Sequence, residues 1–363
     1  MYIRPATGEN IVVENIYSEN PGGYVVDVVG GAYAYDSITN VTVRGVTVDI
    51  DTTGYDVVAV NVGGASTVTI SDIKGYKLSD GPLTTGTRLK NFTISNVVQR
   101  NGKDYAVGIN GCRNGTVTGL TDLDNSTYGV FYPNANTDSL DNVVVSDVTC
   151  LDGGQAIRFT TQNGHTISNF ILTDFTIKNM TGEGILMISY ASPTDSMDIS
   201  ISDGIIKDVG TSAMTIRGAA FGDTLTATVS ISNVTATGSG TYALRASGDY
   251  EGSSSVLLRN CDFSGNTSGA IYNPSANITF SEQPRNVIGY ITTNSGVTSV
   301  ADGGSIGHGL AGTPTAYFFT ATVASHIVAI TGVSADSMAV SLTDTAGVAI
   351  SVAEDVAWWA EIR

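Results

Sequence analysis

Apolar and polar residues alternate along most of this chain, in short stretches that recur. Residues 142–148 (NVVVSDV) return 27 residues later as residues 169–175 (NFILTDF). Alternation with a period of two indicates short strands that bury one face. The first apolar residue of each copy forms a series with spacings of 22 to 30 residues, in which only Gly115 matches poorly: Ile11, Val41, Val68, Phe92, Gly115, Val143, Phe170, Ile199, Val229, Val256 and Ile278.

Small polar residues stand at fixed places in each copy. Asn usually precedes the first apolar position, and the fourth residue after that position is Asn, Asp or Gly. These residues tolerate left-handed backbone and therefore indicate bends. A copy of this size cannot bury its own apolar face, so successive copies must stack on one another. The sequence therefore predicts an all-β fold, a parallel β-helix of about 10–11 coils over residues 1–286, with equivalent side chains one coil apart.

Over roughly residues 8–285 the repeat resembles the right-handed, pectate-lyase-like β-helix superfamily. The resemblance implies a fold rather than an activity, because folds of this kind carry many functions. The first coil begins almost at the start of the sequence and would leave an open sheet edge. We therefore expect an upstream domain or a partner to cover the N-terminal coil.

The repeat stops after Phe280, and residues 287–363 contain shorter strand patterns separated by turn residues. We expect a small C-terminal β-sandwich there. The stretch from Asp302 to Thr315 resembles a short C-terminal module of phage tail and spike proteins, which implies a capping or trimerisation role. Trp358 and Trp359 are adjacent on a predicted strand and must face opposite ways. One can enter the sandwich core, and the other needs a partner, which is the last coil, a second subunit of a homotrimer or, alternatively, a carbohydrate.

The composition limits the choice of partners. The net charge of −17 argues against nucleic acid, which requires a basic surface. It also makes an acidic polymer a poor ligand unless cations cluster locally. No cofactor is certain, and calcium is the ion that the acidic surface could hold. No apolar run approaches the ~20 residues of a membrane span, so we expect no membrane insertion. Cys261 occupies an inward position, which predicts a buried free thiol.

A second strand follows in each coil, and its outward positions form a candidate binding face. The pattern predicts that Ile157 and Phe159 point inward and Arg158 outward. Arginine donates to carboxylates, sulfates and sugar hydroxyls, and aromatic rings provide flat platforms for sugars. The predicted glycan-binding residues are Arg158, Arg217, Arg245, Phe131, Tyr272 and Met187. The alternative is an idle surface where these arginines pair with turn aspartates.

A column of tyrosines precedes the small residue of the same strands, at Tyr24, Tyr105, Tyr128 and Tyr242. We interpret it as a stacked corner ladder, with a second sugar platform as the functional alternative.

The catalytic motifs of polygalacturonase-like hydrolases are only partly present. Residues 136–138 (NTD) and 164–165 (GH) are similar to parts of them, but the Asp pair is broken at residues 152–154 (DGG) and no Arg-x-Lys follows. Hydrolysis by paired carboxylates is therefore unsupported. Lyase-like members of the superfamily imply a Lys or Arg base beside an acidic sugar. The catalytic candidates are Arg158, Asp138, Asp152 and Glu183.

Three hypotheses follow from these features. The first is an extracellular or virion-surface, tail-spike-like protein that binds a surface polysaccharide along one face of the β-helix. A stronger version of this hypothesis adds that the protein depolymerises the polysaccharide. The second is a secreted polysaccharide lyase or glycoside hydrolase. The third is a structural fibre or adhesin without catalysis.

Overall fold

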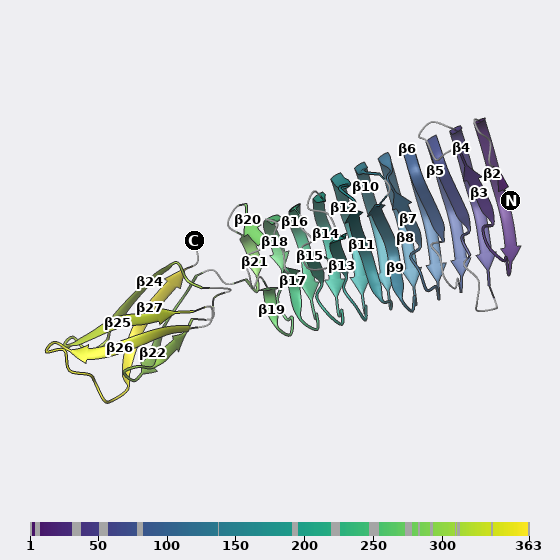
Figure 1. The fold of residues 1–363 in the computed structure, drawn as a ribbon. Helices are drawn as coiled ribbons and strands as arrows, with labels where there is room; N and C mark the ends of the chain where they lie inside the picture. Colours follow the sequence, from purple (N-terminus) through teal and green to yellow (C-terminus); the bar gives the residue numbers. More distant parts are fainter. Residues whose placement is uncertain are drawn as a thin grey trace. The chain divides into compact units, whose positions relative to one another are not determined.

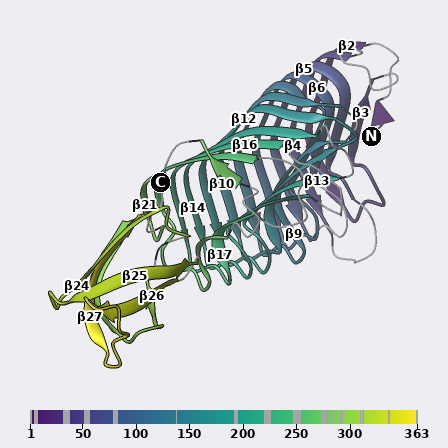
Figure 2. The ribbon, with the colours of Figure 1, turned by 60° about the vertical axis from the view of Figure 1, so that its left-hand side comes forward.

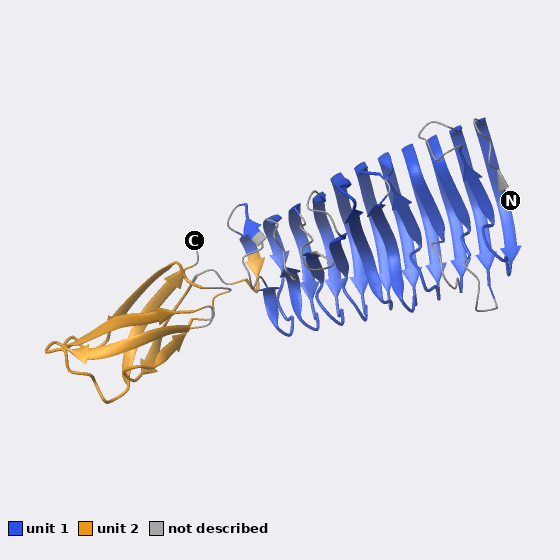
Figure 3. Ribbon diagram, in the orientation of Figure 1, with its two compact units in different colours: residues 1–286 blue, residues 287–363 orange. Residues whose placement is uncertain are grey.

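The structure is a computed structural model of the whole chain (Figure 1). It describes residues 2–3, 8–30, 38–50, 57–77, 83–136, 138–190, 195–218, 226–246, 254–272, 278–281, 284–290, 293–308, 310, 313–334 and 337–361. The chain forms two compact units, residues 1–286 and 287–363 (Figure 3).

The first unit is a parallel β-helix, in which strands of successive coils run side by side (Figures 1 and 2). Its longer strands pair in parallel into one ladder, called here the long ladder. In order, they are β2 (Gly8–Glu19), β4 (Ile38–Asp49), β5 (Val60–Tyr76), β6 (Thr84–Arg100), β8 (Arg113–Leu123), β10 (Leu140–Leu151), β12 (Thr166–Lys178), β14 (Ser196–Lys207), β16 (Thr226–Thr237), β18 (Ser254–Asp262) and β20 (Ile278–Phe280). The strand β21 (Arg285–Ile288) also pairs with β18.

The shorter strands form a second parallel ladder, called here the short ladder. It consists of β1 (Tyr2–Ile3), β3 (Val26–Val29), the first residues of β5 and β6, β7 (Val107–Asn110), β9 (Tyr128–Ala135), β11 (Gln155–Gln162), β13 (Ile185–Tyr190), β15 (Met214–Gly218), β17 (Tyr242–Ala246) and β19 (Gly269–Tyr272). β5 and β6 continue from one ladder into the other without a break.

The core consists of the stacked apolar side chains that the repeat predicts. Val143 pairs with Phe170, Phe170 pairs with Ile199, and all three are buried. Gly115, the poor match in this column, pairs with Phe92. A Cβ atom at Gly115 would lie 2.0 Å from Cε1 of Phe92, so the Phe92 ring fills the space that a larger residue at 115 would need. The predicted stacking of equivalent residues one coil apart is confirmed.

The bends between strands use left-handed backbone, as the Asn and Asp pattern predicts. Asp203, Asn233 and Asn260 have φ angles of 55°, 54° and 52°. Their side chains also form a ladder: Asn233 Nδ2 donates to Asp203 Oδ1 at 2.9 Å, and Asn260 Nδ2 donates to Asn233 Oδ1 at 3.3 Å. One residue type therefore satisfies both the backbone angle and the coil-to-coil hydrogen bond.

A small polar group lies inside the solenoid. Asp122 pairs in register with Gln99 on one side and Cys150 on the other, and all three side chains are buried. The thiol of Cys150 lies 3.9 Å from Asp122 Oδ2, and Oδ1 of Asp122 has no hydrogen-bond partner. Burial raises the pKa of the Asp122 carboxyl to about 8. Cys112, Cys150 and Cys261 are all free and buried.

The second unit consists of two three-stranded antiparallel sheets. One contains β22 (Thr293–Val300), β27 (Glu354–Glu361) and β24 (Ala316–Ala321), and the other contains β23 (Ser305–Gly307), β26 (Ser337–Asp344) and β25 (His326–Val333). The buried core includes Ile306, Met338, Val340, Val356 and Trp358. Trp358 therefore takes the inward position, and its Nε1 donates to Thr298 Oγ1 at 2.9 Å.

Candidate functional site

The outward positions of the short ladder form two neighbouring columns of side chains. Outer column 1 is Asp27, Asn61, Thr85, Gly108, Tyr132, Arg158, Leu186, Thr215, Arg245 and Tyr272. Outer column 2, two residues further along each strand, is Gly63, Thr87, Asn110, Asn134, Thr160, Ile188 and Arg217. Four of the six predicted glycan-binding residues lie in these columns, namely Arg158, Arg217, Arg245 and Tyr272.

The predicted outward positions of Phe131 and Met187 are wrong. Phe131 pairs with Ile157 and Met187 pairs with Phe159, so both lie in inward columns. Both side chains are 0% exposed, and the Phe131 ring packs 6.2 Å from the ring of Phe170. The register is irregular between Gln155 and Ile157, and an offset of one residue moves a side chain to the opposite face of a strand. Neither residue can contact a ligand on the surface.

The structure places Arg158 and Arg245 on outer column 1, three coils apart, and Arg217 on outer column 2. Tyr272 follows Arg245 on the next coil, and the Arg245 guanidinium carbon lies 5.9 Å from its ring centroid. The rings of Tyr272 and Tyr242 stack at 4.9 Å.

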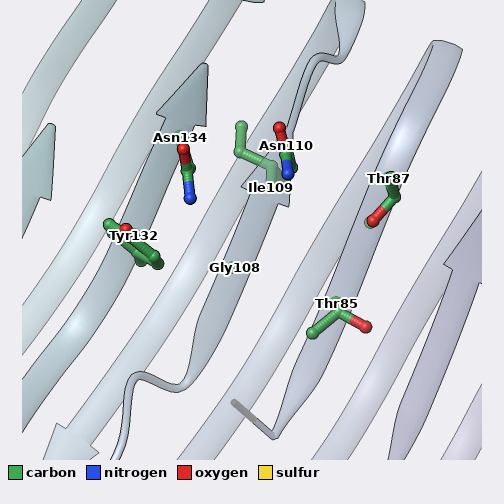
Figure 4. A pocket seen from close by; sticks show the side chains of 8 residues that line it. Thr85, Thr87, Gly108, Ile109, Asn110, Tyr132 and Asn134 are labelled. Atoms are coloured by element: carbon green, nitrogen blue, oxygen red, sulfur yellow. The ribbon is translucent and has the colours of Figure 1, made fainter. Parts of the chain in front are cut away.

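A shallow depression interrupts outer column 1 at Gly108 (Figure 4). Its volume is about 190 Å³, and its wall residues include Thr85, Tyr132, Asn110 and Asn134. Val107 and Ile109 are buried, so residue 108 faces outward and the absence of a side chain there opens the space. Oδ1 of Asn134 has no hydrogen-bond partner. Hydroxyl and amide groups around an apolar ring are suited to a polar, disc-shaped ligand such as a sugar.

Hydrogen bonds fix the polar side chains on the N-terminal side of the depression. Thr85 Oγ1 donates to Asn61 Oδ1 at 2.6 Å, and Asn61 Nδ2 donates to Asp27 Oδ1 at 2.6 Å. This chain of bonds runs along outer column 1 and ends where Gly108 begins the depression, so the Thr85 wall is held in place before any ligand binds.

On the other side of the depression, aromatic rings and one guanidinium form a continuous stack. The Tyr105 ring lies 5.0 Å from the ring of Tyr128 and 5.0 Å from the ring of Tyr132. The Arg158 guanidinium carbon lies 5.9 Å from the Tyr132 ring centroid and 5.7 Å from that of Tyr190. Arg158 also donates to the Tyr190 hydroxyl. We call Tyr105, Tyr128, Tyr132, Arg158 and Tyr190 the tyrosine–arginine stack.

The electrostatics of the stack keep Tyr105 and Tyr132 neutral and Arg158 charged. Burial raises the pKa of Tyr105 well above its usual value and also raises the pKa of Tyr132. Burial acts to lower the pKa of Arg158, but Tyr105, Tyr190 and Tyr132 act in the opposite direction and the net pKa is raised. The site therefore holds a permanent cation against uncharged aromatic faces.

The three carboxylate candidates lie in different surroundings. Glu183 is linked to the stack, because Gln155 Nε2 donates to Glu183 Oε2 at 2.9 Å and the Tyr105 hydroxyl donates to Gln155 Oε1 at 3.3 Å. Asp138 pairs instead with Arg113 at 3.1 Å and with Arg88 at 4.0 Å.

Asp152 belongs to a bend and has a φ of 58°, and its Oδ1 accepts from Asn179 Nδ2 at 2.9 Å. The structure thus brings Glu183, but neither Asp138 nor Asp152, into a hydrogen-bond network with the stack. Thr137 of the NTD motif lies outside the described residues.

Sequence reasoning missed Tyr132 and Tyr190. An outward Phe131 would turn its neighbour Tyr132 inward, so the one-residue offset that misplaces Phe131 also hides Tyr132. Tyr190 lies four residues beyond Leu186, the coil neighbour of Arg158, and only the reach of the arginine side chain brings them together. The predicted stacking in the tyrosine column is present for Tyr105 and Tyr128, whereas Tyr242 stacks on Tyr272.

Within the described ranges, no group of three or more His, Cys, Asp or Glu side chains could hold a metal ion. The described residues also include no helix that is long and apolar enough to cross a membrane.

Comparison with known proteins gives matches only among solved structures. A scan against protein-family models and a search of curated proteins give no match. The tailspike protein gp49 from Pseudomonas phage LKA1 matches 97% of this chain and 67% of its own length, with 14% identity and a TM-score of 0.46. The gp54 tailspike of Acinetobacter baumannii bacteriophage AP22, in complex with A. baumannii capsular saccharide, matches 87% of this chain and 68% of its own, with 12% identity and a TM-score of 0.39.

A third match is the catalytic unit of a GH87 α-1,3-glucanase from Streptomyces thermodiastaticus. It covers 77% of this chain and 62% of its own, with 14% identity and a TM-score of 0.39. The chain spans about two thirds of the length of each of these proteins. The fold is defined by the strand pairings described above, which make it a parallel β-helix.

Proposed function

We propose that the protein binds a polysaccharide along outer columns 1 and 2 of the short ladder. The observation that supports this proposal is the depression at Gly108 beside the tyrosine–arginine stack. The depression offers hydroxyl and amide groups, and the adjacent stack offers a fixed cation and aromatic faces. Partly exposed aromatic and charged side chains recur along the columns at Tyr132, Arg158, Arg217, Arg245 and Tyr272, whereas Leu186, Ile188 and Thr215 between them are buried. Because these partly exposed side chains are spread over several coils, the surface suits a long ligand with a repeating unit. The proposed place of action is a virion surface or the extracellular space.

The proposal predicts that single changes on these columns reduce glycan affinity. Tyr132→Ala removes the ring between the depression and Arg158, and Arg158→Gln removes the charge. We expect each to weaken binding of a polysaccharide ligand, selected from a panel of purified bacterial polysaccharides, by about 10- to 100-fold, the range of one charged hydrogen bond or aromatic contact.

The matched control is Arg44→Gln, because Arg44 lies on the long ladder and pairs with Glu14 at 2.8 Å. Calorimetry with the selected polysaccharide gives the affinities of the wild type, the two face variants and the control. Equal affinities for the wild type and both face variants would refute the assignment of this face.

A second candidate function is cleavage of the bound chain. It is favoured by the link from Glu183 through Gln155 to Tyr105, which brings one carboxylate to the stack that contains Arg158. A single carboxylate with a guanidinium fits β-elimination from an acidic sugar better than hydrolysis, which uses two carboxylates. In that elimination a base takes the proton next to the sugar carboxylate, the glycosidic C–O bond breaks, a C=C bond forms and the leaving oxygen gains a proton. Ultraviolet absorbance of unsaturated ends would report it, and new reducing ends without that absorbance would indicate hydrolysis.

For the C-terminal unit we propose a role in forming a homotrimer. Phe318 is 64% exposed and Val297 is 63% exposed, and both pair across the sheet with β27, where Trp359 and Ala357 face the same side. An exposed apolar patch of this kind is typical of an interaction surface. Phe318→Ser is expected to convert a trimer into monomers in sedimentation experiments, and a wild-type chain that sediments as a monomer would refute the proposal.

A further inference from the structure

Three arginines on the binding face have no acidic partner. Arg158, Arg217 and Arg245 form no ion pair with any carboxylate in the described part of the chain, and the Nε atom of each is buried without a hydrogen-bond partner. Elsewhere the chain does pair its arginines, as Arg44 does with Glu14 and Arg113 with Asp138. A partly buried cation without a counter-ion is costly, so the face is favourable for an incoming anion.

Carboxylates are rare in the two outer columns, in contrast to the composition of the chain, and Glu183 reaches the stack only through Gln155. The chain contains 34 Asp and Glu residues against 17 Lys and Arg. Outer column 1 from Gly108 to Tyr272 and outer column 2 from Gly63 to Arg217 nevertheless contain no Asp or Glu among the described residues. An anionic ligand therefore meets less electrostatic repulsion at this cationic strip than elsewhere on the acidic surface.

The cationic strip occupies only one half of the face. Around Gly108 the wall residues are Thr, Asn and Tyr, all uncharged, whereas the arginines begin two coils later at Arg158. The carboxylate of outer column 1 on the N-terminal side is Asp27, whose Oδ1 accepts from Asn61 Nδ2, and Asp104 lies near Tyr105 outside the columns. The binding face therefore has a neutral end at the depression and a cationic end from Arg158 to Arg245.

We propose that the face recognises an anionic polysaccharide in a fixed orientation, with an uncharged sugar in the depression and acidic groups of later sugars on Arg158, Arg217 and Arg245. This inference rests on the proposed polysaccharide-binding function and specifies its substrate class. The shared chemistry is an anionic oxygen group, either a carboxylate, a sulfate or a phosphate, since each accepts from a guanidinium.

The coil spacing sets the distances that the ligand must match. Coils are ~4.8 Å apart, so Arg158 lies ~10 Å from Gly108 along the column and Arg245 lies a further ~14 Å away. A single monosaccharide cannot reach from one of these positions to the next. The ligand must therefore carry its anionic groups on separate sugars.

The test begins with purified bacterial capsular polysaccharides, both acidic and neutral, bound to the full-length protein by calorimetry. The tightest ligand is then remeasured after its anionic group is removed, by carboxyl reduction, desulfation or dephosphorylation, and these three treatments identify the group. We expect removal to weaken binding by about 10- to 100-fold, the range of one or more charged hydrogen bonds. Arg158→Gln and Arg245→Gln should weaken binding of the native ligand similarly and that of the neutralised ligand by less than about 3-fold, because only the native ligand retains the group that pairs with these residues.

The neutral end is tested separately by Gly108→Val, which fills the depression and should weaken native and neutralised ligands equally. Asn134→Ala serves as a second variant in case the valine disturbs the strand, and thermal melting verifies the fold of each. If the native and neutralised ligands bind equally, or the tightest ligand is neutral, the inference is overturned while the proposed function stands. If no polysaccharide binds, the proposed function itself falls.

Discussion

The buried carboxyl of Asp122 makes the stability of the β-helix depend on pH. Its pKa is raised to about 8 inside the solenoid, whereas an unfolded aspartate has a pKa of 3.8. A raised native pKa means that the folded state binds the proton more tightly, so this group stabilises the fold fully below pH 3.8. The contribution is lost as pH rises toward 8, and above pH 8 it stays lost. Asp122→Asn keeps the shape of the side chain and removes the titration.

The magnitude follows from the size of the shift. One pKa unit corresponds to ~1.4 kcal/mol. The difference in free energy of unfolding, variant minus wild type, should therefore increase by on the order of 5 kcal/mol as the pH rises from below the unfolded pKa to above the folded pKa. Little difference is expected at pH 4, most of it at pH 7, and a plateau above pH 8. Other titrating groups, such as Asp302 with its lowered pKa, are present in both proteins and cancel in the difference.

Guanidinium unfolding of the full chain measures this difference directly. Both tryptophans lie in the C-terminal unit, at positions 358 and 359, so their fluorescence reports that unit alone. Circular dichroism reports mainly the larger β-helix. The circular dichroism midpoint of Asp122→Asn should rise above wild type with pH, while the fluorescence midpoint stays unchanged. A variant-to-wild-type difference that is the same at pH 4 and pH 8 would show that the carboxyl does not titrate in this range and refute the reasoning.

Two further changes test how the coils pack and bend. Gly115→Val should destabilise the β-helix by about 1–3 kcal/mol through collision with the Phe92 ring. Phe92→Val in the same chain should restore part of that loss, and simple additivity of the two changes in a double-mutant cycle would contradict the proposed fit. Asn233→Ala should cost about 1–3 kcal/mol, because alanine lacks the polar side chain that makes left-handed backbone tolerable for asparagine, and because the change breaks the side-chain ladder. Asn233→Gly removes only the ladder and should cost less in the same denaturant titration, whereas an equal loss in both variants would mean that the backbone angle is not the cause.

Much of the fold follows from the sequence because two constraints repeat in every coil. The column through Val143 and Phe170 has to face inward, since a strand with a period of two has only two faces. The bends at Asn233 and its equivalents need residues that accept positive φ. Gly115 looks like a failure of the pattern, but it is part of a pair with Phe92 that only the coil register reveals.

The proposed binding face is predicted less well because the short strands carry few residues to fix their register. Ile157 and Phe159 are placed correctly, and Arg158 therefore lies on the outer face. In the neighbouring coils an offset of one residue turns Phe131 and Met187 inward and Tyr132 outward. The contact between Arg158 and Tyr190 depends on side-chain reach across the surface, which no spacing in the sequence encodes.

The depression and the tyrosine–arginine stack occupy β7, β9, β11 and β13, with β1, β3, β5 and β6 before them on the short ladder and β15, β17 and β19 after them. In a solenoid each coil is held chiefly by its two neighbours, so melting starts at the ends and advances coil by coil. Several turns must open before such melting reaches Gly108 or Arg158 from either direction. The proposed recognition surface is thus several coils away from either end of the ladder, and mild heat or denaturant that opens the outermost coils should leave the proposed ligand binding intact.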